Sequence, residues 1–276
     1  MAVYDELKAQ AVERELSLAG MTRPMIEAGV AWARTPTIPL GVDGGDGAPH
    51  LLFFAPTRWG KSTVINEYVI PWLGRGRRTV VLTSVDSDIR KIYRDGFEVV
   101  PLGSRRKFPT FDNDLFQTIK GLQFEPEIEA EVNRAVEAVA ASRRPKVLVA
   151  VTAPDSGVNK WRVNSFITEM VGRQWGGRGL LLVVEDAFKY KCEELVGSGR
   201  KSGIVAVLAT IKMPDEDTLR NTRIVLGPVG AGTATRIDPT IVAISKRLGR
   251  GEFLWQYSAG RWARFRHEKR REAKKR

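Results

Sequence analysis

The sequence predicts an α/β fold in three layers, with a mainly parallel central sheet covered by helices on both faces. Short runs of residues are almost entirely apolar rather than alternating, as in strands that are buried on both faces. These runs alternate along the chain with longer helix-like stretches, which is the pattern of strand–helix–strand units. With 276 residues, of which 43% are hydrophobic and 28% charged, the chain is long enough to bury one sizeable core.

The predicted elements follow one another in a regular order. The predicted strands are residues 51–54, 79–83, 146–152, 180–184, 204–210 and 222–226. The predicted helices are residues 61–72, 86–94, 125–143, 159–174, 188–196 and 239–248. Residues 252–257 and 261–266, separated by Ser258-Ala259-Gly260, predict a terminal β-hairpin. The segment 96–122, which carries Arg105, Arg106 and Lys107, has no predicted structure.

The two ends of the chain differ in composition from its middle. Residues 1–46 predict a small helical N-terminal extension, with one helix before Gly20 and another over 23–34, followed by a connector rich in Pro, Gly and Asp. Residues 47–266 form the predicted central domain. Residues 267–276 are a predicted basic C-terminal tail.

The excess of basic over acidic residues indicates which kind of partner the protein could bind. The chain has 44 Lys and Arg against 32 Asp and Glu, a net charge of +12, and residues 261–276 alone contain nine Lys or Arg and two Glu. Such a tail favours a polyanion, most simply nucleic acid; the alternative is a solvated tail that only keeps the protein soluble. No apolar run approaches the roughly 18 to 20 residues of a membrane span, and the N-terminus does not resemble a secretory signal. One cysteine and two histidines exclude a disulfide framework and argue against a Cys/His metal site, so we expect an intracellular protein.

The most informative motif follows the first apolar strand. Gly60 lets successive backbone N–H groups point at phosphate oxygens, Lys61 reaches the β- and γ-phosphates, and the Ser62 hydroxyl ligates magnesium. The usual first glycine of such a Walker A loop is Ala55 here, which the loop tolerates if φ stays negative. The alternative is a chance Gly-Lys-Ser at a helix start. We predict an ATP-binding loop made of Ala55, Pro56, Thr57, Arg58, Trp59, Gly60, Lys61, Ser62 and Thr63.

A second motif ends the apolar strand 180–184 with Glu185 and Asp186. This is a Walker B pattern, in which one acid holds the metal and the next orients or deprotonates the attacking water. By position Glu185 faces the metal together with Ser62, and Asp186 faces the water, although the common order is Asp then Glu. The alternative is an acidic turn at a strand end.

An arginine, Arg200, precedes the predicted strand 204–210, which ends at Thr210. At a strand start an arginine can project from the subunit edge and reach the γ-phosphate that a neighbouring subunit binds. From the residues alone, a surface arginine in a loop is the simpler interpretation.

Taken in order, these motifs resemble the FtsK–HerA superfamily of ring-forming DNA translocases. The resemblance covers about residues 50–257 and implies that Arg200 acts in trans as a catalytic residue. In that superfamily a polar residue, usually glutamine, follows the Ala-Thr and senses the γ-phosphate. The position is Ile211 here, which leaves Thr210 as the candidate substitute. The matching residues are 55–62, 185–186, 200–203, 208–210, Pro214, Asn221 and 251–254.

Within the superfamily, the chain length and the small N-terminal piece are similar to the genome-packaging ATPases of membrane-containing icosahedral viruses. This resemblance implies ATP and Mg²⁺ as cofactors and a homo-oligomeric ring, often a hexamer, that moves double-stranded DNA into a preformed capsid. Capsid-vertex or viral membrane proteins would then be partners, and the location would be the host cytoplasm or the virion vertex; a cellular relative would be cytoplasmic. The candidate DNA contacts are the tail, Arg105, Arg106, Lys107, Lys160 and Arg162.

Two other functions stay open at this point. A small-molecule kinase on the same scaffold would need neither DNA nor an arginine in trans. A nucleotide-dependent DNA-binding or assembly protein with weak hydrolysis would account for Ala55, for the order Glu185–Asp186 and for Ile211.

Overall fold

The fold is described from a computed structural model of the chain. The structure describes residues 31–32, 50–84, 92–93, 96–103, 125–152, 157–177, 179–258 and 260–266. The chain divides into two compact units, a larger one of residues 49–52 and 62–222 and a smaller one of residues 1–48, 53–61 and 223–276. Each unit is described by itself. Strands β2 (His50–Phe54) and β8 (Thr222–Leu226) begin in the larger unit and end in the smaller one.

The larger unit is built on a parallel sheet with the strand order β2-β7-β6-β3-β5-β4. Strand β3 lies between β5 and β6 and pairs in parallel with both, β6 pairs in parallel with β7, and β5 with the edge strand β4. Every residue of β6 and β7 is buried, as expected of strands covered on both faces. The strands are β3 (Arg78–Ser84), β4 (Glu98–Leu102), β5 (Lys146–Val151), β6 (Leu180–Val184) and β7 (Ile204–Thr210).

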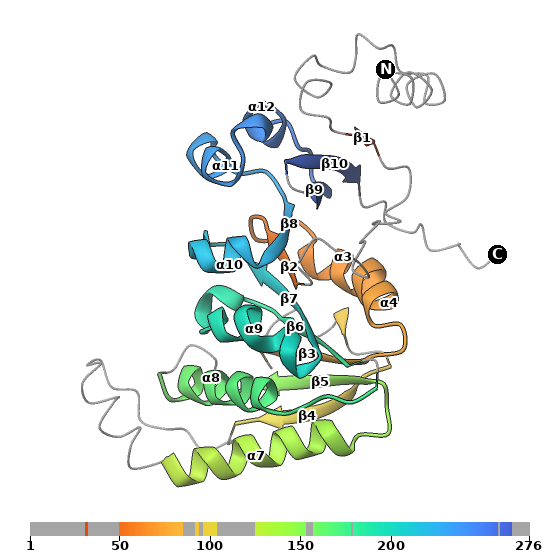
Figure 1. The fold of residues 1–276 in the computed structure, drawn as a ribbon, viewed down its shortest axis with the longest axis vertical. Helices are drawn as coiled ribbons and strands as arrows, with labels where there is room; N and C mark the ends of the chain where they lie inside the picture. Colours follow the sequence, from red (N-terminus) through yellow and green to blue (C-terminus); the bar gives the residue numbers. More distant parts are fainter. Residues whose placement is uncertain are drawn as a thin grey trace, which may run out of the picture. The chain divides into compact units, whose positions relative to one another are not determined.

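Helices flank this sheet, and Figure 1 shows three of them, α7, α8 and α9, alongside strands β3 to β7. The longest, α7, packs against α8 and against the edge strand β4. Its apolar side chains recur at Ile128, Val132, Ala135, Val136 and Val139, and all five are buried, which is the spacing of one helix face. Among the described residues of this unit after β4, the helices are α7 (Glu125–Ala141), α8 (Gly157–Gly172), α9 (Glu193–Ser198) and α10 (Glu216–Arg220), with 3₁₀ turns at Ala187–Lys189 and Gly199–Ser202.

The helix that follows β2 is irregular. It begins as α3 (Lys61–Val64), continues as a π-helical turn (Ile65–Val69) and ends as α4 (Ile70–Leu73). Pro71 has no backbone N–H to donate to the preceding turn. The π-helical turn lies just before this proline. Its different hydrogen bonding lets the helical segment continue although Pro71 donates no hydrogen bond.

The smaller unit has the strand order β1-β10-β9-β8-β2. Strands β9 (Glu252–Ser258) and β10 (Arg261–Arg266) form an antiparallel hairpin, and β9 pairs antiparallel with β8. Two tryptophans, Trp255 and Trp262, are almost completely buried and supply much of the core of this unit. Helices α11 (Ala231–Ile237) and α12 (Val242–Ser245), with a 3₁₀ turn at Pro239–Ile241, connect β8 to the hairpin.

Most predicted strands are confirmed, and the differences have physical causes. The predicted helix 23–34 is wrong at its end, because Ala31–Trp32 form a short strand, β1, that pairs in parallel with Ala263 and Arg264 of β10. Backbone pairing at a sheet edge overrides the local helix pattern there. Strand β4 lies in the segment that had no predicted structure, and α10 and α11 were not predicted. The rest of the N-terminal extension, nearly all of the predicted helix 86–94 and the tail 267–276 lie outside the described residues.

Among the described residues, no helix combines the length and the apolar character needed to cross a bilayer.

Candidate nucleotide site

The loop between β2 and α3 turns sharply around the side chain of its own lysine. The Lys61 ammonium donates hydrogen bonds to the carbonyl oxygens of Ala55 (2.7 Å) and Pro56 (3.0 Å). Gly60 has φ +97° and Arg58 has φ 61°, so the loop bends through two residues in the left-handed region, where glycine is favoured. A Cβ built on Gly60 would meet no atom within 4 Å. Gly60 is therefore required for its backbone angle and not for space.

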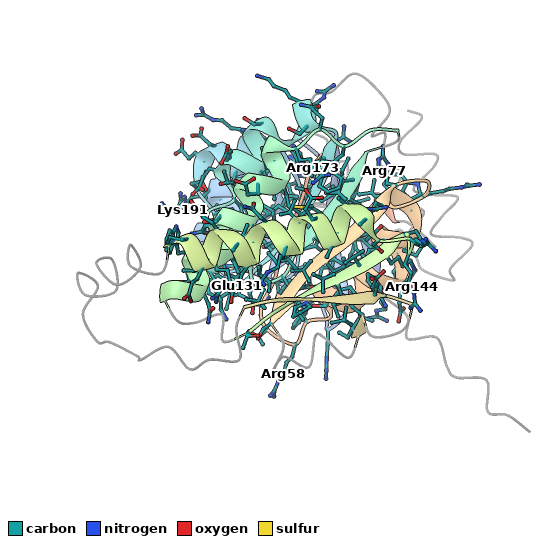
Figure 2. The ribbon with its side chains drawn as sticks, turned by 90° about the horizontal axis from the view of Figure 1, so that it is seen from below. Arg58, Arg77, Glu131, Arg144, Arg173 and Lys191 are labelled. Carbon is teal, nitrogen blue, oxygen red and sulfur yellow. The ribbon has the colours of Figure 1, made fainter. Side chains whose placement is uncertain are left out.

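A second contact set supports this loop from within the smaller unit. The Trp59 indole N–H donates to the Glu252 carbonyl oxygen at the start of β9 (3.0 Å). A Cβ on Gly227 would lie 2.4 Å from the Ala55 Cβ and 3.3 Å from the Trp59 ring. The glycine that follows β8 therefore makes room for the alanine that replaces the usual first glycine of the motif. Arg58, by contrast, extends away from the ribbon (Figure 2) and is exposed.

In the larger unit, the start of the helix and the end of β6 meet at one hydroxyl group. The Tyr93 Oη lies 2.5 Å from a carboxylate oxygen of Glu185 and 3.3 Å from the Ser62 carbonyl oxygen. Tyr93 is fully buried and Glu185 is 3% exposed. Burial, and then the negative charge of Glu185, raise the pKa of the Tyr93 hydroxyl well above its ordinary value. Tyr93 therefore stays protonated and donates its hydrogen to the Glu185 carboxylate.

The neighbouring acid, Asp186, lies in a different environment. Its backbone is in the left-handed region with φ 53°, and its carboxylate pairs with the Lys189 ammonium three residues later, at 3.5 Å. The side chain of Asp186 is about one third exposed. Because of the left-handed turn, Asp186 lies toward the 3₁₀ turn that follows. Glu185 instead continues the sheet, and its backbone N–H donates to the Leu82 carbonyl oxygen of β3 (3.0 Å).

Thr210 ends β7 and is 3% exposed. Its hydroxyl takes part in a local turn, in which it accepts from the Lys212 N–H and donates to the Lys212 carbonyl oxygen. The side chain also lines a pocket of about 230 Å³ with residues that include Leu52, Leu208 and Asp215. Ile211, at the position of the superfamily sensor, is 39% exposed.

Arg200 lies at the opposite end of β7, in the 3₁₀ turn Gly199–Ser202, and is exposed. Strand β7 runs from Ile204 to Thr210, and at 3.3 Å per residue its two ends lie about 20 Å apart. Arg200 precedes the first end, and Thr210 is the second. Nearby, the buried His50 imidazole accepts from the Ala206 N–H (2.9 Å). Burial, and then the charge of Arg200, lower the pKa of His50 to about 4. Arg200 therefore marks the amino-terminal edge of the sheet, and Glu185 and Thr210 the carboxyl-terminal edge.

The oxygen atoms around Tyr93 are of the kind that a magnesium ion binds. Among the described residues there is no cluster of three or more His, Cys, Asp or Glu arranged to hold a metal. Magnesium bound with a nucleotide does not need one, because it keeps several waters and takes one or two protein oxygens together with phosphate oxygens. The Ser62 hydroxyl and the Glu185 carboxylate belong to residues that both contact Tyr93, and they fit this requirement.

Solved structures of similar fold include a DNA-packaging ATPase and a plasmid coupling protein. The DNA-packaging ATPase B204 from Sulfolobus turreted icosahedral virus matches with a TM-score of 0.52 at 14% identity, over 81% of this chain and 100% of that one. The plasmid coupling protein TrwB in complex with the GTP analogue GDPNP matches with a TM-score of 0.54 at 13% identity, over 87% of this chain and 89% of that one. The fold is that of a P-loop NTPase. No protein-family model matches the sequence, and no curated protein does. The resemblance expected from the motifs is thus confirmed at the level of the fold.

Within this P-loop NTPase fold, the predicted site residues fall into two groups. Ser62 and Glu185 come together at Tyr93, and the loop 55–61 leads directly into Ser62. Asp186 pairs with Lys189 instead, and Arg200 lies at the far edge of the sheet. Sequence reasoning missed Tyr93, because a tyrosine in an expected helix carries no signal of its own. Tyr93 follows β3, and Glu185 follows β6. The two residues are close because β3 and β6 are neighbours in the sheet, which the sequence does not show.

One of the candidate DNA contacts is wrong. Arg162 is 1% exposed and forms an ion pair with Glu131 at 2.7 Å. Its guanidinium is therefore not accessible to DNA. Lys160 is exposed. Arg105, Arg106, Lys107 and the tail lie outside the described residues.

Proposed function

We propose that this protein is an ATP-hydrolysing, double-stranded DNA translocase that packages a viral genome into a preformed capsid. The observation that carries the ATPase part is the contact of Tyr93 with both Ser62 and Glu185; along the chain, the loop that closes around Lys61 leads directly into Ser62. Through Tyr93 the backbone of the helix start and a buried carboxylate meet at one hydroxyl group, and we infer that the Ser62 hydroxyl and the Glu185 carboxylate share one metal ion. The similarity in fold to a viral packaging ATPase and to a conjugative coupling protein supports the DNA part.

We assign the roles at the site as follows. The backbone N–H groups of residues 55–63 and the Lys61 ammonium bind the phosphates of ATP. Ser62 and Glu185 hold the magnesium ion, which would neutralise charge on the phosphates. Tyr93 holds the Glu185 carboxylate in place, and Asp186 and Thr210 are the further candidates for orienting the attacking water. Residues 47–266 would form the ATPase domain, between the N-terminal extension and the basic tail.

Arg200 supports a ring as the working assembly. It lies about 20 Å from the carboxyl-terminal edge of its own sheet, so it cannot reach the phosphates that its own subunit binds. If Arg200 acts on a nucleotide, that nucleotide is therefore bound by a neighbouring subunit, as the resemblance to the superfamily implies. A homo-oligomeric ring, of which a hexamer is the usual form in the superfamily, would supply that neighbour.

One observation favours a second function. The carboxylate of Asp186 pairs with Lys189, and Ile211 replaces the polar sensor. A protein with such a site could bind nucleotide and assemble on DNA with little turnover. Normal nucleotide affinity without hydrolysis, even with DNA present, would support this alternative.

The proposed function is tested by measuring ATP hydrolysis with and without random-sequence duplex DNA. We expect the duplex to stimulate hydrolysis several-fold. Lys61→Ala should lower the rate about a hundredfold or more, because the developing charge on the phosphates loses a fixed cation. The exposed Lys191 provides a matched control, and Lys191→Ala should leave the rate unchanged. Hydrolysis that does not respond to DNA would point to a kinase or another P-loop enzyme.

A further inference from the structure

We propose that the amino-terminal edge of the parallel sheet is a binding surface for the phosphate backbone of duplex DNA. The inference rests on the proposed function, and it says which surface of the protein the DNA contacts. The edge consists of the loops that enter β3, β5, β6 and β7, and we call it the basic edge. Its described residues are 74–78, 142–146, 173–177, 179 and 197–203. They contain nine Lys or Arg and no Asp or Glu.

The four loops lie side by side because the strands that they enter are neighbours in the order β7-β6-β3-β5. Hydrogen bonds join them in pairs. The Thr79 N–H donates to the Pro145 carbonyl oxygen (2.7 Å), and the Trp175 N–H donates to the Ser202 carbonyl oxygen (3.0 Å). The parallel pairing of β3 with β6 then connects the two pairs of loops. Basic residues from four separate parts of the sequence therefore share one edge.

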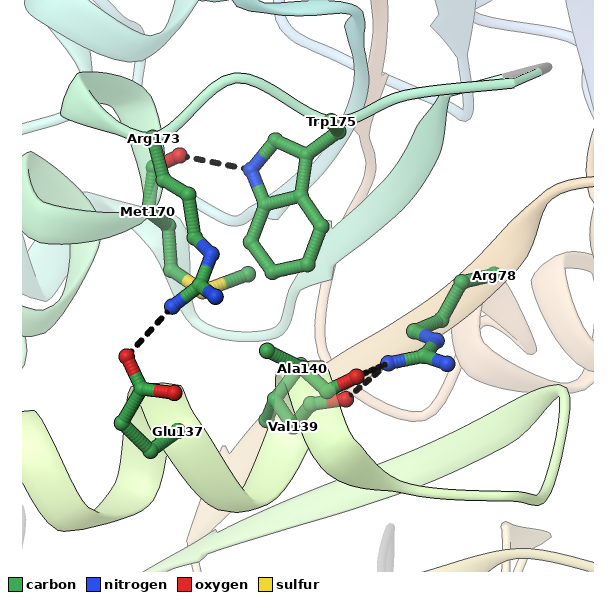
Figure 3. Close-up of polar contacts among 7 residues, drawn as sticks. All are labelled: Arg78, Glu137, Val139, Ala140, Met170, Arg173 and Trp175. Atoms are coloured by element: carbon green, nitrogen blue, oxygen red, sulfur yellow. Dashed lines mark hydrogen bonds and ion pairs between the residues drawn. The ribbon is translucent and has the colours of Figure 1, made fainter.

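Some cations of the basic edge are engaged within the protein. Arg78 donates to the carbonyl oxygens of Val139 and Ala140 and so caps the end of α7 (Figure 3). Arg173 pairs with Glu137 at 2.6 Å and lies over the Trp175 ring (Figure 3). These contacts hold the loops in place, and these two arginines are not our candidates for DNA contact. Arg200 is not a candidate either, because we assign it to the nucleotide of a neighbouring subunit.

Three other arginines leave their charge available to a partner. Arg75, Arg143 and Arg144 are exposed, and none of them forms an ion pair with an acid of the described residues. Figure 2 shows Arg144 at one end of α7, whereas Lys191, which follows β6 at the opposite edge of the sheet, lies toward the other end. The basic edge thus presents positive charge on the side of the sheet that the nucleotide does not occupy.

The width of the basic edge selects the kind of polyanion. Three inter-strand spacings of about 4.8 Å give a width of about 14 Å. Duplex DNA carries one negative charge per about 1.7 Å of its axis, on the order of eight charges over that width. Exposed cations lie at both ends of this width, Lys201 before β7 and Arg143 and Arg144 before β5, and a single triphosphate group is too short to pair with both ends. Contacts to phosphates also carry no sequence information, which suits a motor that moves along any DNA.

The experiment compares two triple variants that change the net charge equally. The test variant is Arg75→Glu, Arg143→Glu and Arg144→Glu. The control is Arg134→Glu, Lys191→Glu and Arg236→Glu, whose three side chains are exposed but lie outside the basic edge. Affinity for a random-sequence 30-base-pair duplex is measured over a range of salt concentrations, together with the basal ATPase rate and the mass of the assembly.

We expect the test variant to bind the duplex at least tenfold more weakly at 0.1 M salt. The slope of log K against log salt should decrease by about three, one for each lost phosphate contact. Its basal ATPase rate and assembly mass should match those of the parent, and the control should lose little affinity.

Parent-like DNA affinity in the test variant would overturn the inference alone. Loss of the assembly in the test variant would overturn it too, since the edge would then be a contact between subunits. A parent protein that hydrolyses ATP but binds no duplex would instead refute the DNA part of the proposed function.

Discussion

At the scale of single residues, the hydroxyl of Tyr93 connects the two motifs that would handle the nucleotide. It is fully buried, and the edge of the Phe97 ring packs against its own ring at a centroid distance of 5.8 Å. A buried hydroxyl that donates to a carboxylate restricts the orientation of that carboxylate, because breaking the hydrogen bond in the interior is costly. Tyr93 is therefore a positioning residue for Glu185.

Removing only this hydroxyl should slow the chemical step without unfolding the protein. Tyr93→Phe keeps the ring packing and loses the hydrogen bond to Glu185, so we expect kcat to fall about tenfold while KM for ATP changes less than threefold. Steady-state kinetics at saturating Mg²⁺ measures both quantities. Phe97→Leu, which changes packing but no polar contact, is the control. A kcat equal to the parent's would show that Tyr93 is only a packing residue.

The buried histidine at the start of β2 gives a pH prediction. Because the pKa of His50 is lowered to about 4, the unfolded chain binds a proton near pH 6.5 and the folded chain does not. The free energy of unfolding should therefore fall as the pH decreases from about 6.5 to 4, by at most about 3 kcal/mol from this residue. Urea unfolding of the parent and of His50→Asn, whose amide oxygen can still accept from the Ala206 N–H, measures the difference. An equal pH dependence in both proteins would contradict the account.

Site residues that belong to a motif could be proposed from the sequence, whereas contacts that depend on the topology of the sheet could not. Lys61, Ser62 and Glu185 belong to short patterns whose chemistry is local. Tyr93 has no such pattern, and Asp186 differs because a left-handed turn directs its side chain to Lys189. Neither contact can be derived from residue spacing.

At the scale of elements, the phosphate-binding loop is held by the segment after β8 as well as by its own turn. Gly227 donates its N–H to the Phe54 carbonyl oxygen (2.9 Å) and leaves space for the Ala55 methyl group. The alanine and the glycine are thus complementary in size. This pairing explains how the loop keeps its shape without the usual first glycine.

That complementarity predicts a compensating pair of substitutions. Gly227→Ala places a Cβ 2.4 Å from the Ala55 Cβ, so it should destabilise the protein by about 1–3 kcal/mol and raise KM for ATP. Adding Ala55→Gly removes that clash and should restore most of the loss, although the contacts at 3.3 Å to the Ala55 Cα and to Trp59 remain. Thermal unfolding and ATP kinetics of the three variants measure this. A double variant as impaired as Gly227→Ala would contradict the size-matching argument.

Elements also show what the sequence could and could not predict. The strands of the parallel sheet are continuous apolar runs with a single interpretation, and β7 and β8 have the predicted limits. Strand β4 alternates between buried and exposed residues at the edge of the sheet and contains Pro101, so its pattern was too weak. Strand β1 depends on pairing with β10, more than two hundred residues away, and no local pattern indicates such a contact.

At the scale of the whole molecule, the proposed nucleotide residues and the basic residues lie at opposite edges of the sheet. The carboxyl-terminal edge carries Ser62, Tyr93 and Glu185, and the amino-terminal edge carries Arg200 and the arginines of the basic edge. A subunit that binds ATP at one edge and presents cations at the other suits an assembly in which neighbours complete one another's sites. The net charge of +12 favours binding of such an assembly to DNA.

The proposed ATPase activity depends on Lys61 in the phosphate-binding loop and on the buried Glu185 carboxylate. This claim is tested most directly by measuring Mg-ATP affinity and hydrolysis side by side in Lys61→Ala and Glu185→Gln. We predict that Lys61→Ala loses both affinity and turnover, whereas Glu185→Gln binds nucleotide within a few-fold of the parent and hydrolyses it at least a hundredfold more slowly. Hydrolysis at the parent rate in either variant would contradict the claim.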